Sequence, residues 1–163
     1  MNLRLAAPAR QPGARGFTLL EIMVVACIVG MLASIAVPWF VKARSNAEDA
    51  AFINDMRVAT GGFISYSLAA RTLPPDAAPG VLPTGVEEYF SRRFDWTAPT
   101  PIGGQWDWDY GLYGVKAAVS VVGPVRTPAQ MLAIDRKIDD GDLSTGNFRA
   151  RPGGSGYMSI VEE

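Results

Sequence analysis

The chain has 163 residues, of which 48% are hydrophobic and 19% charged, and its net charge is −1. Its length suits one small domain, and its near-neutral charge gives no electrostatic reason to bind nucleic acid. The absence of histidine excludes Ser-His and Cys-His catalytic sites, and the single cysteine, Cys27, excludes an intramolecular disulfide.

Residues 1–16 form a short basic leader, and the apolar segment 17–41 follows with no charge after Glu21. Twenty helical residues span about 30 Å, the thickness of the hydrocarbon core of a bilayer. The segment therefore predicts a retained transmembrane helix. The alternative is a secretory signal peptide, whose apolar region has only about 7–15 residues and ends in a small-residue cleavage site.

Basic residues on the two flanks predict the orientation of this helix. Arg4, Arg10 and Arg15 precede it, whereas Lys42 and Arg44 follow it. Because the cytoplasmic flank carries more Lys and Arg, we expect a cytoplasmic N-terminus and an exported C-terminal part. Removing residues 1–16 would change the net charge from −1 to −4, so the exported part is mildly acidic.

Glu21 is a single acid at the start of the apolar segment. An acidic side chain costs about 2.5–3.5 kcal/mol at the bilayer centre, and less near the interface. The cost requires either a cationic partner or an interfacial position in which the side chain reaches water.

Further along the same segment, Ala26, Gly30 and Ser34 repeat every four residues. Such a ridge lets helices approach closely in lipid, although small residues are also common in membrane helices for other reasons. Pro38 removes one backbone donor, so we expect a kink there.

Helical periodicity continues through residues 42–72, because apolar residues recur there at spacings of three and four. The stripe consists of Phe52, Met56, Ala59, Phe63, Tyr66 and Ala70. We therefore predict one helix from Phe17 to about Ala70, with Gly61-Gly62 as a second weak point. The proline-rich residues 73–80 end it.

Residues 73–163 predict a small β-rich domain. After an irregular stretch with a short helical turn near 86–90, the alternating residues 105–110 predict a half-buried strand, and 113–122 a second one. Gly111-Leu112 would form the tight turn between them. Thr127-Pro128 predicts the start of a helix that ends at Asp140-Gly141. A loop at 142–154 and a last strand at 157–161 complete the pattern.

The sequence from Gly16 through Phe17 to Glu21, with the apolar helix behind it, resembles the N-terminus of type IV pilins and type II secretion pseudopilins. Arg15, Gly30 and Pro38 also fit that pattern. The matching stretch covers about residues 15–45, and the rest of the chain fits only the general plan of the family. The resemblance implies an α+β fold in which the long N-terminal helix packs on a small antiparallel sheet.

The resemblance also implies a function. A membrane-embedded prepilin peptidase would cut between Gly16 and Phe17 and methylate the new amino group of Phe17. Glu21 would then pair with the Phe17 ammonium of a neighbouring subunit in a filament. The subunit would be a structural protein and not an enzyme, single-pass in the bacterial inner membrane with a periplasmic C-terminal domain. Its partners would be further copies, related pilin subunits, an assembly platform and an ATPase. Lack of a disulfide loop favours a pseudopilin over an adhesive pilin.

Two weaker patterns suggest binding sites. The aromatic residues Trp96, Trp106, Trp108, Tyr110 and Tyr113 suggest either a polysaccharide-binding surface on a membrane-anchored module or, more simply, core packing. Asp139, Asp140 and Asp142 are weak candidates for calcium ligands. Their spacing does not match an EF-hand, and a solvated helix end explains them more simply, so we expect no cofactor.

Overall fold

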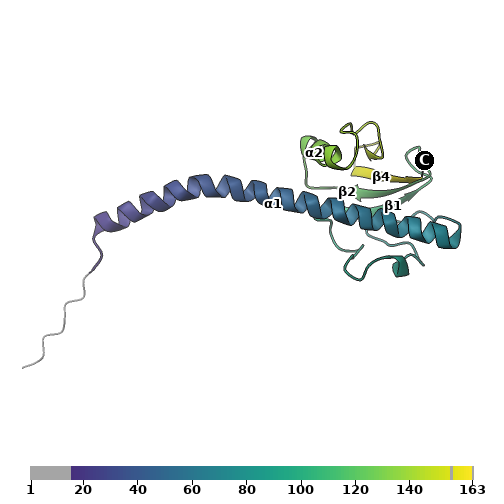
Figure 1. Ribbon diagram of the computed structural model, residues 1–163, viewed down its shortest axis with the longest axis horizontal. Helices are drawn as coiled ribbons and strands as arrows, with labels where there is room; N and C mark the ends of the chain where they lie inside the picture. Colours follow the sequence, from purple (N-terminus) through teal and green to yellow (C-terminus); the bar gives the residue numbers. More distant parts are fainter. Residues whose placement is uncertain (1–15, 155, 163) are drawn as a thin grey trace, which may run out of the picture. The chain divides into compact units, whose positions relative to one another are not determined.

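The computed structural model describes residues 16–154 and 156–162, so the expected leader lies outside the described residues except for Gly16. The chain divides into two compact units, one up to Lys42 and one from Ala43 onward. Helix α1 (Leu19–Ala70) contributes to both (Figure 1). The remaining elements, which all belong to the second unit, are the 3-10 turn η1 (Glu87–Tyr89), four strands and helix α2.

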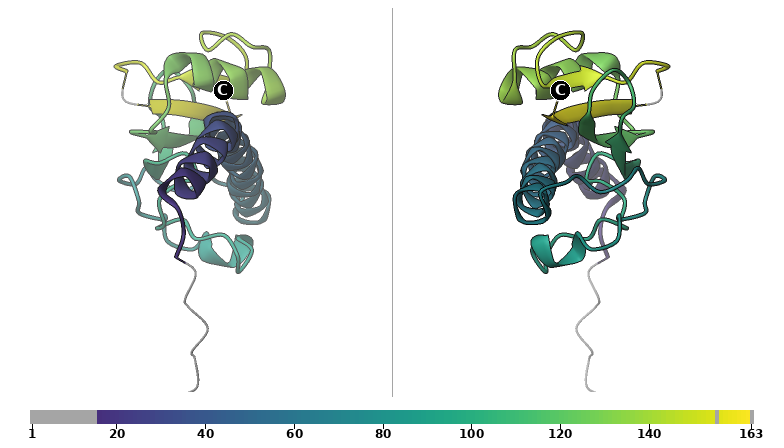
Figure 2. Two further views of the ribbon diagram at one scale, coloured as in Figure 1. Left: turned by 90° about the vertical axis from the view of Figure 1, so that its left-hand side faces the viewer. Right: turned by 90° about the vertical axis from the view of Figure 1, so that its right-hand side faces the viewer.

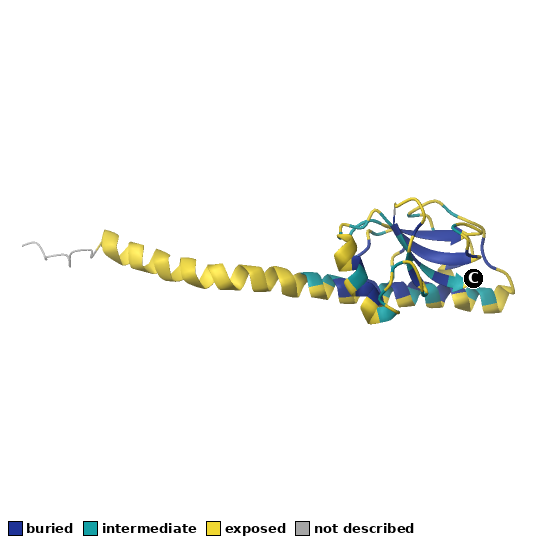
Figure 3. Cartoon of the chain, turned by 90° about the horizontal axis from the view of Figure 1, so that it is seen from above, coloured by how far each residue is buried: buried dark blue, intermediate teal, exposed yellow. Residues whose placement is uncertain are grey.

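Helix α1 confirms the predicted continuation of the apolar segment, although it begins two residues later than expected. In its first part the side chains are exposed, as the yellow ribbon of Figure 3 shows, and none of the residues from Leu19 to Arg44 is buried. The helix continues without a break through Pro38, which has no N–H to donate, and through Gly61-Gly62.

In the second unit, the buried face of α1 forms the core together with one face of the sheet. Phe52, Met56, Ala59 and Phe63 are at most 3% exposed, which confirms most of the predicted stripe. Tyr66 is half-buried and Ala70 is exposed, so the stripe ends earlier than expected. Ile53 and Asp49 are also buried, because the helix presents a broader face to the core than a single stripe.

The two adjacent glycines of α1 have different environments. A Cβ on Gly62 would lie 2.5 Å from Cε1 of Phe90, so the ring of Phe90 packs directly on the helix backbone. Phe90 in turn makes an edge contact with Phe63, with ring centroids 5.6 Å apart. A Cβ on Gly61 would meet nothing within 4 Å. Packing within the described residues thus explains why position 62 is a glycine, but it does not explain the glycine at position 61.

The sheet has four antiparallel strands in the order β1-β2-β4-β3. The strands are β1 (Gln105–Tyr110), β2 (Ala117–Val122), β3 (Phe148–Ala150) and β4 (Gly156–Glu162). In the end-on views of Figure 2, α2 lies on one side of α1 and η1 on the other. Trp106 and Trp108 of β1 face α1, where they stack on Phe52 and Phe63 with ring centroids 5.6 and 3.8 Å apart.

Four predictions in the sheet are wrong. β1 is buried on both faces, and not half-buried, because Asp107 and Asp109 on its outer face are covered. The predicted tight turn at Gly111-Leu112 is a longer loop, in which Gly111 N–H donates to the Lys116 carbonyl. β2 accordingly begins at Ala117 and not at residue 113. The loop predicted at 142–154 also contains the short strand β3.

Helix α2 (Pro128–Ile138) has the predicted start. Thr127 Oγ1 accepts a hydrogen bond from Gln130 N–H, and the Gln130 side chain accepts one from Thr127 N–H. The helix ends two residues before Asp140. Arg126, just before it, binds Glu48 and Asp49 of α1 at 2.8 and 3.1 Å and so fastens this loop to the helix.

Candidate processing and assembly site

The start of α1 is built by a local hydrogen bond. Thr18 Oγ1 accepts from the backbone N–H of Glu21 at 3.2 Å, and the Thr18 carbonyl accepts from Ile22 N–H at 3.3 Å. A threonine followed three residues later by glutamate is the sequence pattern of a helix N-terminus. Sequence reasoning overlooked Thr18, although this spacing was the available signal.

Gly16 and Phe17 lie just before this cap. Phe17 is 79% exposed, and a Cβ on Gly16 would meet nothing within 4 Å. Packing within residues 16–154 and 156–162 therefore gives no steric reason for a glycine at this position. An exposed, unhindered Gly-Phe bond next to a fixed helix end is accessible to an enzyme that binds the backbone closely.

Glu21 lies in the first turn of α1, where the helix dipole stabilises a negative charge. Its side chain is exposed, and no cation pairs with it among the described residues. As far as the described residues are concerned, the carboxylate is available to a group from another chain.

The predicted packing residues share this exposed segment. Ala26, Gly30, Ser34 and Pro38 are all exposed, and Ser34 Oγ donates to the Met31 carbonyl at 2.7 Å. A Cβ on Gly30 would meet nothing within 4 Å. By length and composition, α1 is long and apolar enough to cross a membrane.

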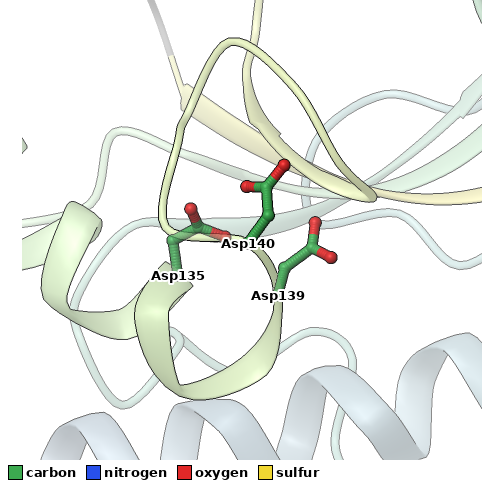
Figure 4. A group of neighbouring side chains, drawn as sticks. All are labelled: Asp135, Asp139 and Asp140. Carbon is green, nitrogen blue, oxygen red and sulfur yellow. The ribbon is translucent and has the colours of Figure 1, made fainter.

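At the end of α2, the structure brings together Asp135, Asp139 and Asp140, whose nearest carboxylate oxygens all lie within 4.8 Å of one another. Figure 4 shows these side chains facing the loop that follows the helix. Asp142, the third predicted ligand, is not part of this group and accepts instead from Ser144. Asp135 was missed by sequence analysis because its spacing is that of a helical core position.

The acidic group has one unusual member. Asp135 is fully buried, and neither of its carboxylate oxygens has a hydrogen-bond partner among the described residues. Burial, followed by the charges of Asp140 and Asp139, raises the pKa of Asp135. Asp139 and Asp140 accept hydrogen bonds from the loop, including those from Phe148 N–H and Thr145 Oγ1.

Comparisons with known proteins agree with the geometry at the helix start. The family described as "Prokaryotic N-terminal methylation motif" matches residues 12–37, which include Gly16, Phe17 and Glu21. The chain is 54% identical over 41 residues to the type IV major pilin protein PilA of Myxococcus xanthus, and this stretch is 24% of the chain and 19% of that protein. It is 43% identical over 54 residues to the type II secretion system core protein G of Klebsiella pneumoniae, covering 33% of the chain and 39% of that protein.

Two further matches extend beyond the N-terminal segment. The chain is 26% identical over 135 residues to the type IV wide pilus major component PilA4 of Thermus thermophilus, covering 71% of the chain and 98% of that protein. The structure of the major type IV pilin PilA1 from Clostridium difficile superposes with a TM-score of 0.53 at 17% identity, over 73% of the chain and 97% of that pilin. This chain has a prepilin methylation motif and the fold of a type IV pilin.

The pilin fold accounts for the aromatic residues. Trp96, Trp106 and Trp108 are at most 3% exposed and belong to the core between α1 and the sheet. Only Tyr110 and Tyr113 of the group have appreciable exposure. The buried indoles offer no stacking surface to a polysaccharide, which removes the support for a binding module of that kind.

A buried ion cluster covers the outer face of the pilin sheet. Arg151 donates to Asp107 at 2.9 Å and to Asp109 at 3.1 Å. Its guanidinium also lies 4.4 Å from the centre of the Tyr113 ring and donates to the Tyr113 hydroxyl. Burial, followed by the charge of Asp109, raises the pKa of Asp107 to about 6. All three charged side chains are at most 7% exposed, so the cluster is better placed to hold the sheet than to meet a substrate.

Proposed function

We propose that this chain is a structural subunit of a type IV pilus or type II secretion pseudopilus. The observation that carries the proposal is the exposed Gly16-Phe17 bond directly before a capped apolar helix whose first turn holds Glu21. The match of this segment to the methylation motif supports the same proposal. No catalytic role is required of the subunit.

A prepilin peptidase would cut between Gly16 and Phe17 and methylate the new amino group. Phe17 would then carry a cation, close to the positive end of the α1 dipole, where a cation is disfavoured within its own chain. A carboxylate from another subunit would relieve this repulsion.

Glu21 of a neighbouring subunit is the group we assign to that role. It is exposed and has no cationic partner among the described residues. Pairing the two charges lowers the cost of holding each in apolar surroundings, and it also determines the axial offset between adjacent helices. The apolar side chains of 22–41 would exchange lipid contacts for contacts with neighbouring helices.

In this scheme the subunit is anchored in the bacterial inner membrane with its N-terminus in the cytoplasm and its sheet domain in the periplasm. The arginines of the leader support this topology. The peptidase, an assembly platform and an ATPase would act on it there, and related pilin subunits would join the filament. Since Cys27 is the only cysteine, the disulfide loop of adhesive pilins is absent from this sequence, which favours a pseudopilus. The long alignment with a pilus component favours a pilus.

Neutralising Glu21 tests the proposal. The Glu21→Gln variant of the full chain, expressed with a prepilin peptidase and the assembly machinery, should insert and be cut after Gly16 but yield less than a tenth of the wild-type filaments. The matched control is Glu88→Gln, which removes an exposed carboxylate outside α1 and should assemble normally. Wild-type filament yield from Glu21→Gln would contradict the pairing.

We also propose that the acidic group at the end of α2 binds a divalent cation such as calcium. Calcium takes six to eight oxygen ligands, and both oxygens of the buried Asp135 are available here together with oxygens of Asp139 and Asp140. Gly146 (φ +72) allows the loop to come close, because a Cβ there would lie 2.1 Å from Asp139 Oδ2. A cation would neutralise three carboxylates that repel one another.

Thermal unfolding of the full chain in detergent tests the cation site. Millimolar calcium should raise the melting temperature by several degrees relative to EDTA, because a ligand of the native state stabilises it. Asp135→Asn should abolish this difference, whereas Asp142→Asn, outside the group, should retain it. Equal melting temperatures of the wild-type chain in calcium and EDTA would show that Asp135 is instead kept neutral by a proton.

A further inference from the structure

A groove of about 300 Å³ runs along the surface of α1 in the second unit. Its sides come from α1, the end of α2, and strands β3 and β4. Most of its lining consists of apolar side chains and one glycine, namely Ile53, Met56, Gly61, Ile64, Ile138 and Phe148. Nothing in the described part of the chain occupies this groove.

Gly61 lies in the wall of the groove that α1 provides, and the fold gives no reason for a glycine there. Glycine weakens a helix interior relative to alanine. At Gly62 the ring of Phe90 accounts for that loss, but a Cβ on Gly61 would meet nothing within 4 Å. A bare backbone position facing an open groove suits close approach by another chain.

The apolar surface continues along α1 beyond the groove. Ile64 is 42% exposed and Leu68 is 76% exposed, and with Gly61 they follow one another at spacings of three and four. Residues at these spacings share one face of a helix. The groove is therefore part of a longer apolar face that is uncovered among the described residues.

The charges around the groove limit what fits it. Two charged side chains line the groove. Asp139 already accepts hydrogen bonds from Asn147 N–H and Phe148 N–H, and Arg57 is the one cation among the described lining residues. A strongly charged partner would gain little, whereas an uncharged apolar helix can pack on the apolar part of each wall. Thr60, Asn147 and Ser159 supply the polar remainder of the lining. The same chain carries such a helix, because residues 22–41 have no charge and their large apolar side chains are 50–78% exposed.

We infer that this groove binds the apolar helix, residues 22–41, of a second copy of the chain. Gly61 lets the two helix backbones approach closely, and Ile64 and Leu68 extend the contact along α1. The inference rests on the proposed filament and names the surface of each subunit that receives its neighbour.

Filling the groove is the first test. Gly61→Leu in the full chain should melt no lower than wild type in detergent, because the added side chain has open space, yet filament yield should fall at least tenfold. Ala133→Leu is the matched control, because it enlarges an exposed small residue of α2 outside the groove and should leave the yield unchanged. Wild-type yield from Gly61→Leu would overturn the inference.

Crosslinking identifies the occupant even if Gly61→Leu fails to fold. In a Cys27→Ala background, a cysteine replacing Ile64 is combined with single cysteines scanned through residues 24–36, and assembled filaments are treated with a short bis-maleimide. Crosslinked dimers should recur at every third or fourth scanned position, because only the side chains on one face of the apolar helix contact the groove. A cysteine replacing Ala133 should give none. No periodic crosslinks, or crosslinks at Ala133 of equal yield, would overturn the inference.

The failures of the two proposals are distinguishable. If the wild-type chain is neither cut after Gly16 nor polymerised, the proposed filament function fails and the groove contact fails with it. If wild-type filaments form but Gly61→Leu assembles normally and Ile64→Cys gives no periodic crosslinks, only the groove assignment is wrong.

Discussion

Replacing Gly61 and Gly62 separately by alanine should change stability in opposite directions. The two residues are neighbours on α1, so each variant adds one methyl group to the same helix. Their surroundings differ, because a Cβ on Gly62 would lie 2.5 Å from Cε1 of Phe90 and 2.8 Å from its Cδ1, whereas a Cβ on Gly61 would meet nothing within 4 Å.

The expected magnitudes follow from this difference. Alanine is more favourable than glycine in a helix interior by about 1 kcal/mol, and Gly61→Ala should gain that amount. Gly62→Ala gains the same term but must displace the Phe90 ring, which packs against Phe63, Phe94 and Trp96. Overpacking of this kind costs about 1–3 kcal/mol. The two variants should therefore differ by about 2 kcal/mol, with Gly62→Ala the less stable.

Urea unfolding of the full chain in detergent, followed by tryptophan fluorescence, measures this difference directly. Trp96, Trp106 and Trp108 lie in the core beside Phe63 and Phe90, so their emission reports the relevant packing. Equal shifts of the two midpoints in the same direction would refute the close contact between Phe90 and the helix backbone.

Two further predictions concern the sheet and α2. Burial raises the pKa of Asp107 to about 6, so the native state binds a proton more tightly than the unfolded chain does. The free energy of unfolding should therefore fall as pH rises from about 4 to 7, which should lower the melting temperature by about 5 °C. Asp107→Asn should flatten this pH dependence. Thr127→Ala removes the N-cap of α2 and should cost about 1 kcal/mol in urea unfolding, whereas Thr127→Ser should cost much less.

Sequence patterns were sufficient for the parts of the fold that depend on local chemistry. The apolar periodicity around Phe52, Met56 and Phe63 predicted the buried face of α1, and Thr127-Pro128 predicted the start of α2. Both signals act within a few residues along the chain. Gly16 and Phe17, the proposed processing residues, were also visible in the sequence, because the methylation motif that contains them is a short linear pattern.

The features that sequence reasoning missed depend on contacts between distant residues. Asp107 and Asp109 looked like the exposed side of a strand, but Arg151, more than forty residues away, covers them. The loop 111–116 is held by Tyr113 in a left-handed conformation (φ 54), which no turn pattern indicated. Asp135 sits at an apolar position of α2 and becomes a candidate ligand only when the following loop turns back toward it.

The start of α1 could be interpreted only in part from the sequence, for a different reason. Glu21 stood out as a charge in an apolar segment, but its proposed partner belongs to another subunit and is created by cleavage. What the structure adds is the cap by Thr18, which positions the first turn, and the exposure of both Phe17 and Glu21. Neither group is satisfied within the described part of the chain.

The central claim is that the chain is cut after Gly16 and polymerises through the new N-terminus. Mass spectrometry of the N-terminal peptide, from protein isolated out of native membranes, tests it most directly. We predict a mature chain that begins at Phe17 with one methyl group on its α-amino nitrogen. An intact leader, or a chain that begins at any other residue, would contradict the account.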